Sequence, residues 1–255
     1  MKQLNPMMRR SKTTAVGLVL ACLLSPASGA ESFDITACEK DNLAVDTLRT
    51  CLGLAAAPGL TPKARAGIYM MRGVSWLNEY EPAAAVSDFS RAVTLDPANL
   101  AALKGRASAY TLLGAHDLAA NDWSLILKVM PDTEESYRKR GASFLAAGKT
   151  DEAIADYAKA LEINPKSVEA YIGRAGVYDK LNQRDKALKE FDLAVNIDPN
   201  YFPVYVARAE AAVRWGETKL AIESYKKVLK LNSDDWHARK ALQRLGVEQT
   251  PGGRQ

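Results

Sequence analysis

The chain repeats itself with a period of 34 residues. Five blocks of this length follow one another without insertion and begin at Ala66, Leu100, Glu134, Val168 and Phe202. Every block has a small residue at block position 8, an alanine at position 20 and an aromatic residue at position 24, and the first four have proline at position 32. A unit of this length cannot bury an apolar face alone, so the period predicts repeated units that stack on their neighbours.

Each recurring residue type has a physical role in a pair of helices. Small residues at positions 8 and 20 let two helices approach closely, and aromatic residues at positions 4, 11 and 24 fill the space around their crossing. Proline at position 32 stops the second helix. Gly114, Gly148 and Gly216 fit the turn that follows the first helix. The blocks therefore predict an all-α fold of antiparallel helix pairs.

This pattern resembles the tetratricopeptide repeat (TPR) family, whose signature has Gly or Ala at position 8, Tyr at 11, Ala at 20, Phe at 24, Ala at 27 and Pro at 32. The resemblance covers residues 66–235 and implies a right-handed α-solenoid of stacked antiparallel helix pairs. The sequence departs from the signature at Ile126 in the second block and at Ala212, Val228 and Ser233 in the fifth. A final block is expected to degenerate where it meets a cap or solvent.

Both ends of the repeat array look capped. Residues 236–246 predict one amphipathic capping helix, ended by Gly246, before a polar tail at 247–255 that we expect to be disordered. At the front, residues 31–65 read as a degenerate first repeat with Cys38 at position 11 and Cys51 at position 24.

The first 30 residues have the order of a secretory signal peptide. Four cations in residues 1–12 precede the apolar run Ala15 to Leu24, and small residues lead to an expected cleavage after Ala30. As a membrane anchor the run is too short, since at about 1.5 Å per residue it spans roughly half of a ~30 Å hydrocarbon core. Lipid attachment at Cys22 stays an alternative. We expect a periplasmic or secreted protein without stable membrane insertion after cleavage.

Two cysteines remain once Cys22 leaves with the signal. An even number of cysteines in an exported chain predicts a disulfide, here between Cys38 and Cys51. Positions 11 and 24 face each other across a repeat, so the bond would replace an aromatic contact. A resemblance to exported bacterial TPR proteins with a cysteine pair in the opening repeat supports this.

Charge and motifs argue against several functions. The formal net charge of +4 comes from the four cations of residues 1–12, and the 225 residues after the expected cleavage are formally neutral, which gives no support to nucleic-acid binding. His116 and His237 are the only histidines of the sequence, and neither has an evident nucleophile and carboxylate nearby. Two cysteines without a nearby histidine cannot complete a zinc site. We expect a non-enzyme without catalytic residues, cofactor or metal.

Arginine stands at position 7 of all five blocks, and position 23 is acidic in four of them. The residues are Arg72, Arg106, Arg140, Arg174 and Arg208, opposite Asp88, Asp122, Asp156, Glu190 and Ser224. A row of arginines could bind an acidic ligand, but the matching acidic column favours ion pairs between the two helices of a block. If partly exposed, each pair contributes at most ~1 kcal/mol.

The resemblance places a binding groove on the concave surface lined by the first helices. Positions 2, 5, 9 and 12 share one face of such a helix. We expect an amphipathic segment whose apolar side contacts Met70, Met71, Val74 and Leu77 and whose acidic side faces Lys104, Arg138 and Lys139; Ile172 and Glu210 lie further along. Position 9 has no asparagine, so the carboxylate clamp of some TPR proteins is not reproduced.

Two functions follow. The first is an adaptor that binds a protein or peptide of unknown identity in this groove. The alternative is a cell-envelope accessory factor that binds a polysaccharide, peptidoglycan or a small envelope ligand. The fold alone does not separate them.

Overall fold

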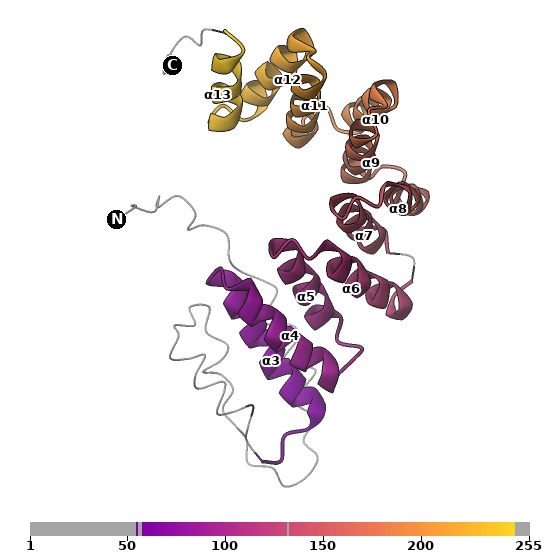
Figure 1. Cartoon of the computed structure of the whole chain (residues 1–255), viewed down its shortest axis with the longest axis vertical. Coiled ribbons are helices and arrows are strands. Elements are labelled where there is room, and N and C mark those ends of the chain that lie inside the picture. Colours follow the sequence, from indigo (N-terminus) through magenta and orange to yellow (C-terminus); the bar gives the residue numbers. More distant parts are fainter. Residues whose placement is uncertain (1–54, 56–57, 132, 248–255) are drawn as a thin grey trace, which may run out of the picture. The chain divides into compact units, whose positions relative to one another are not determined.

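The computed structural model describes Ala55 and residues 58–131 and 133–247 (Figure 1). The expected signal peptide, Cys38, Cys51, most of the degenerate first repeat and the tail beyond Val247 lie outside these residues. The helices divide into two compact units, with the boundary between Leu113 and Gly114. This boundary falls between the two helices of the second block.

Eleven helices make up the described secondary structure, and this part of the chain contains no strand. The N-terminal unit holds α3 (Pro62–Asn78), α4 (Pro82–Leu95) and α5 (Leu100–Leu112). The C-terminal unit holds α6 (His116–Val129), α7 (Glu134–Ala146), α8 (Thr150–Ile163), α9 (Val168–Lys180), α10 (Arg184–Ile197), α11 (Phe202–Trp215), α12 (Thr218–Leu231) and α13 (Trp236–Arg244).

Helices pack in consecutive pairs within each unit. The pairs α3 with α4, α7 with α8, α9 with α10 and α11 with α12 each correspond to one 34-residue block. In the C-terminal unit, first helices also contact one another, α7 with α9 and α9 with α11. The predicted all-α stack of helix pairs is confirmed.

The turn inside every block uses a left-handed residue at position 15. Gly114, Gly148 and Gly216 have φ values of 72°, 83° and 77°, which confirms the predicted glycine turns. In the first and fourth blocks the same conformation is adopted by Tyr80 (φ 61°) and Asn182 (φ 58°). Glycine adopts this conformation without the Cβ strain that other residues meet, so these two blocks form the turn at a cost.

The aromatic residue at position 24 is buried in every block. Phe89 and Phe191 are almost wholly buried, and Trp123, Tyr157 and Tyr225 are at most 8% exposed. Two of the rings lie against a glycine of the next block: a Cβ added at Gly105 would stand 2.4 Å from Phe89, and one at Gly173 would stand 2.3 Å from Tyr157. Burial also raises the pKa of Tyr157 to about 12.

The arginine column pairs with the acidic column, as predicted. Arg72 donates to both carboxylate oxygens of Asp88, Arg140 donates to those of Asp156 at 2.7 Å, and Arg174 donates to Glu190 at 2.9 Å. Each of these acids is at most 8% exposed, and Arg72 is 6% exposed. The ~1 kcal/mol limit for exposed pairs therefore does not apply, because removing one partner leaves a buried charge alone.

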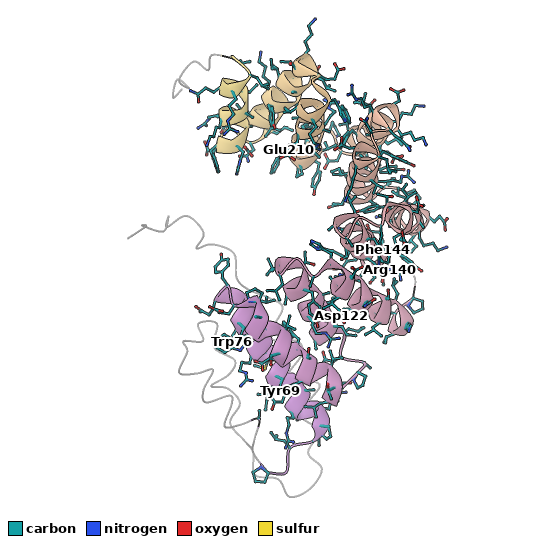
Figure 2. The ribbon with its side chains drawn as sticks, in the orientation of Figure 1. Tyr69, Trp76, Asp122, Arg140, Phe144 and Glu210 are labelled. Carbon is teal, nitrogen blue, oxygen red and sulfur yellow. The ribbon has the colours of Figure 1, made fainter. Side chains whose placement is uncertain are left out.

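Two arginines of the column also donate a hydrogen bond to the block before their own. Arg140 Nη1 donates to Ser124 Oγ at 3.1 Å, and Arg106 Nη1 donates to Ser90 Oγ at 3.3 Å. Both serines occupy position 25 of the preceding block. Figure 2 labels Arg140 beside Phe144, whose ring centroid lies 5.7 Å from the guanidinium carbon. The arginine column therefore holds structure within and between repeats.

Helix α13 takes the place of the first helix of a sixth block. It begins at Trp236, 34 residues after Phe202, and packs on α12. Asp235 caps its start by accepting from the Ala238 amide at 2.8 Å. The helix ends at Arg244, two residues before the predicted end, because Gly246 turns left-handed at φ 76°. At position 7, where the other blocks have arginine, α13 has the fully buried Leu242.

Candidate functional site

The predicted apolar end of the groove lies on α3, and one of its residues belongs to the core instead. Met70 is only 9% exposed and packs in the cluster around Phe89, which corrects its expected place on an open surface. Met71 and Leu77 are partly buried against the same cluster, whereas Val74 is 39% exposed. Of the four apolar residues predicted on α3, Val74 is therefore the one with an exposed side chain.

The predicted cations of α7 differ in their surroundings. Arg138 Nε donates to Glu134 Oε1 at 3.0 Å, and Ser167 Oγ donates to the same oxygen at 2.6 Å. Lys139 is exposed, while Ile172 on α9 is partly buried against the core of the C-terminal unit. Much of the charge of Arg138 is thus already neutralised by its own helix. Lys104, half-buried on α5, belongs to the N-terminal unit.

A hydrogen-bond network around Asp179, at position 12 of the fourth block, joins α9 to α11. Arg214 donates to Asp179 Oδ2 through Nε at 2.9 Å and through Nη2 at 2.6 Å. Trp215 Nε1 donates to Asp179 Oδ1 at 2.7 Å. Asp179 is one of the residues at the groove positions 2, 5, 9 and 12. Both of its carboxylate oxygens accept hydrogen bonds from α11, so it holds α9 and α11 together.

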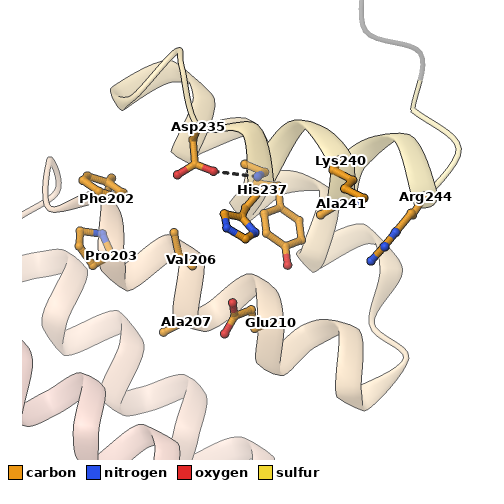
Figure 3. Close-up of a pocket in the computed structure, with 12 residues that line it drawn as sticks. Phe202, Pro203, Val206, Ala207, Glu210, Asp235, His237, Lys240, Ala241 and Arg244 are labelled. Atoms are coloured by element: carbon orange, nitrogen blue, oxygen red, sulfur yellow. Dashed lines mark hydrogen bonds between the residues drawn. The ribbon is translucent and has the colours of Figure 1, made fainter. Parts of the chain in front are cut away.

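Between α11 and α13 the first-helix face opens into a groove of about 480 Å³ (Figure 3). Its lining comprises Phe202, Pro203, Val206, Ala207, Glu210, Tyr225, Asp235, His237, Ala238, Lys240, Ala241 and Arg244. Pro203, Val206 and Glu210 stand at positions 2, 5 and 9 of the fifth block. Of the nine predicted groove residues, Glu210 is the one that lines this groove.

The two walls of the groove differ in chemistry. The α11 wall is apolar apart from Glu210. Burial of the Tyr225 phenol raises its pKa, and the negative charge of Glu210 raises that pKa further. The α13 wall carries Lys240 and Arg244, for which the described residues supply no ion-pair partner. Lys240 Nζ lies 5.7 Å from the ring centroid of Trp236, an aromatic residue that is 59% exposed. The groove thus combines an apolar strip with one cationic wall.

Three residues of the α13 wall are not among the predicted groove residues. His237, Lys240 and Arg244 occupy positions 2, 5 and 9 of α13 when the 34-residue period is continued for one more block. That extension was the signal that could have found them. It is easily overlooked because α13 has leucine at position 7 and no second helix among the described residues.

A second groove lies on α10, α11 and α12 and is more basic. Its lining comprises Val195, Tyr205, Arg208, Glu223, Lys226, Lys227 and Lys230. The ring of Tyr205 lies between Arg208 and Lys227, at 5.4 Å and 5.5 Å from their charged groups. This groove does not use positions 2, 5, 9 and 12.

The described residues show no catalytic constellation. His116 begins α6, and its Nδ1 is buried without a hydrogen-bond partner. No three histidine, cysteine, aspartate or glutamate side chains within residues 58–131 and 133–247 gather as metal ligands do. In the same ranges, every helix is too short or too polar to cross a membrane.

Three tetratricopeptide repeat models match the sequence, at residues 78–125, 144–213 and 202–235. No curated protein matches significantly. Similar solved structures include a tetratricopeptide repeat protein from Parabacteroides merdae, at 20% identity over 79% of this chain and 91% of that one, with a TM-score of 0.60. TTC0263 of Thermus thermophilus is 21% identical over 71% and 98% of the two chains, with a TM-score of 0.59.

MamA from Desulfovibrio magneticus is similar as well, at 22% identity over 67% of this chain and 97% of that chain, with a TM-score of 0.56. Likeness at this level of identity shows the fold. Together with the sequence models and the helix pairs of 34 residues, it establishes that the chain belongs to the tetratricopeptide repeat family.

Proposed function

We propose that the protein is a non-enzymatic adaptor that holds a protein or peptide segment against the first-helix face, meaning positions 2, 5, 9 and 12 of the first helices. Tetratricopeptide repeat proteins are generally non-catalytic scaffolds that bind protein or peptide partners. The partner's identity is open.

The observation that carries this proposal is the groove between α11 and α13. Positions 2, 5 and 9 of both helices line it, so the face expected to bind is hollowed at this place. Its volume of about 480 Å³ falls in the range of sites that hold ligands, and its apolar strip with charged edges suits a side chain anchored beside a polar backbone.

The N-terminal unit offers a second contact on the same positions. Val74 is exposed on α3 and Lys104 lies on α5, so a segment with one apolar and one acidic side fits this unit too. We keep Leu77, Arg138 and Ile172 in the proposed face, together with Met71 and Lys139 at the adjacent position 6. Arg138 is the weakest contributor, since Glu134 already neutralises it.

We place the adaptor in the periplasm or outside the cell, because residues 1–30 have the order of a cleaved signal peptide. Intact mass of protein recovered from the exported fraction tests this. A chain that begins at Glu31 is expected, and retention of residues 1–30 or a lipid on Cys22 would contradict the placement.

Partner capture from the exported fraction tests the adaptor function. Val206→Asp places a charge in the apolar strip and should reduce capture at least about tenfold, since the charge would have to be desolvated. Leu193→Asp, at a 43% exposed position of α10, is the matched control and should capture as the parent does. Both variants must retain the parental circular dichroism. Unchanged capture by Val206→Asp would refute binding in this groove.

A further inference from the structure

We propose that the groove between α11 and α13 selects a partner segment in which a carboxylate-bearing residue lies next to an apolar one. This inference rests on the proposed adaptor function and adds the chemistry of the partner.

Other cations on or beside this face in the C-terminal unit are paired or lie outside the grooves. Arg138 is paired with Glu134, and Arg214, at the adjacent position 13, with Asp179. Lys139 is exposed but lines neither groove. Lys240 and Arg244 stand on one wall of a groove, and no carboxylate of the described chain pairs with either. Two cations four residues apart lie on the same side of a helix, so they present paired positive charge to whatever enters. A carboxylate is the group that complements them.

The surrounding charge reinforces this choice. Residues 202–247 contain nine Lys and Arg and five Asp and Glu, a net charge of +4. The preceding block, residues 168–201, contains five basic and six acidic residues, a net charge of −1. Positive charge therefore collects at the last repeat and its cap, where it steers acidic segments toward the groove.

Glu210 sets the orientation of the bound segment. It lies on the α11 wall, facing the groove opposite the cations of α13 (Figure 3). A like charge repels the partner's carboxylate from this wall, which directs it to Lys240 and Arg244. The apolar side chain then packs on Phe202 and Val206, and Glu210 accepts from the segment's backbone N–H groups.

The experiment is a selection of random peptides displayed on phage against the full mature chain, followed by fluorescence anisotropy on the enriched sequences as synthetic peptides. Enriched peptides should be net negative and contain a large apolar residue beside Asp or Glu. Lys240→Glu with Arg244→Glu should weaken their binding at least tenfold. Glu210→Gln should strengthen it about twofold to fivefold by removing the like charge.

Lys226→Glu with Lys230→Glu is the matched control, because it makes the same charge change in the second groove, on the neighbouring helix α12. In 150 mM salt, the affinity of this control variant for the enriched peptides should stay within twofold of the parent's affinity. An equal loss in both double variants would show that only overall charge matters and would overturn the proposal.

Failure of this inference and failure of the adaptor function give different results. If the enriched peptides are neutral or basic and Val206→Asp abolishes their binding, the preference for an acidic partner is refuted, whereas binding in the groove is supported. No enrichment of any peptide, or enriched peptides that bind Val206→Asp as they bind the parent, would refute both.

Discussion

The third and fourth repeats, α7 to α10, and the last repeat with its cap, α11 to α13, share one sequence pattern but use charge in different ways. In the former, Arg140 and Arg174 are paired with the buried acids Asp156 and Glu190. In the latter, Arg208 donates to Ser224, and α13 replaces the arginine with Leu242. The interior arginines are thus paired with buried acids, whereas Arg208 has a serine and the exposed acids Asp192 and Glu223 as neighbours.

The replacement of arginine by Leu242 at position 7 follows from the place of α13 at the end of the described helices. An arginine at position 7 needs an acid from the second helix of its own block, and the described chain provides none after α13. A buried arginine without that acid would be strongly destabilising, and a leucine fills the same space against α12. Lys240 and Arg244 of α13 stand at positions 5 and 9, where they line the groove.

The largest expected effect is from Asp156→Ala in the interior. It leaves Arg140 without its acid between α7 and α8, and should lower the free energy of unfolding by about 3 kcal/mol. Ser224→Ala, the matched change in the last repeat, removes one hydrogen bond between the Arg208 guanidinium and a hydroxyl. It should cost about 1.5 kcal/mol, because Asp192 and Glu223 remain within 4 Å of Arg208. Urea denaturation followed by circular dichroism measures both. Equal losses would mean that the acidic column has no special role.

Leu242→Ala comes next, because the cap depends on apolar burial instead of charge. Truncating this fully buried side chain should cost about 2.5 kcal/mol, with the loss concentrated in α12 and α13. Hydrogen exchange resolved by segment is the measurement. If α7 to α10 lost protection to the same degree as the cap, the two regions would form one cooperative unit, contrary to a local effect.

Gly173→Ala should cost about 2 kcal/mol, because its Cβ would overlap the buried ring of Tyr157. Gly176→Ala on the same helix is the control. There the new Cβ stands 3.6 Å from Leu145, an ordinary contact, so alanine's higher helix propensity should make the change neutral or stabilising by about 0.5 kcal/mol. Thermal unfolding of the two variants separates steric crowding from helix propensity. An unfolding temperature that falls equally in both variants would contradict a special role for the contact between Gly173 and Tyr157.

The smallest effect concerns the turn at position 15. Asn182→Gly in the fourth repeat should stabilise by about 0.5 kcal/mol, and Gly216→Ala in the last repeat should destabilise by about 1 kcal/mol, since both residues are left-handed. Chemical denaturation of each variant checks the opposite signs. A stabilising Gly216→Ala would show that the last turn is free to change conformation.

Much of the fold could be predicted because the same residue types pack at the same positions of every repeat. The aromatic residues at position 24, the glycine turns and the pairing of Arg140 with Asp156 all follow from residue types at fixed spacing. The candidate site could be predicted less well. Met70 shares a helix face with Val74 in the pattern, but it lies in the core around Phe89. Spacing identifies a face of a helix and does not show how deeply a neighbour covers it.

The sequence by itself determined the period, the helix pairs, the arginine and acidic columns and the first-helix face, since these depend on local geometry that repeats every 34 residues. Only the tertiary structure decided which charges remain available. Arg138 is neutralised by Glu134, and Asp179 is occupied by Arg214 and Trp215, while Lys240 and Arg244 line a groove without an ion-pair partner among the described residues. The reason is that pairing depends on distances between side chains of different helices, which a single helix pattern does not contain.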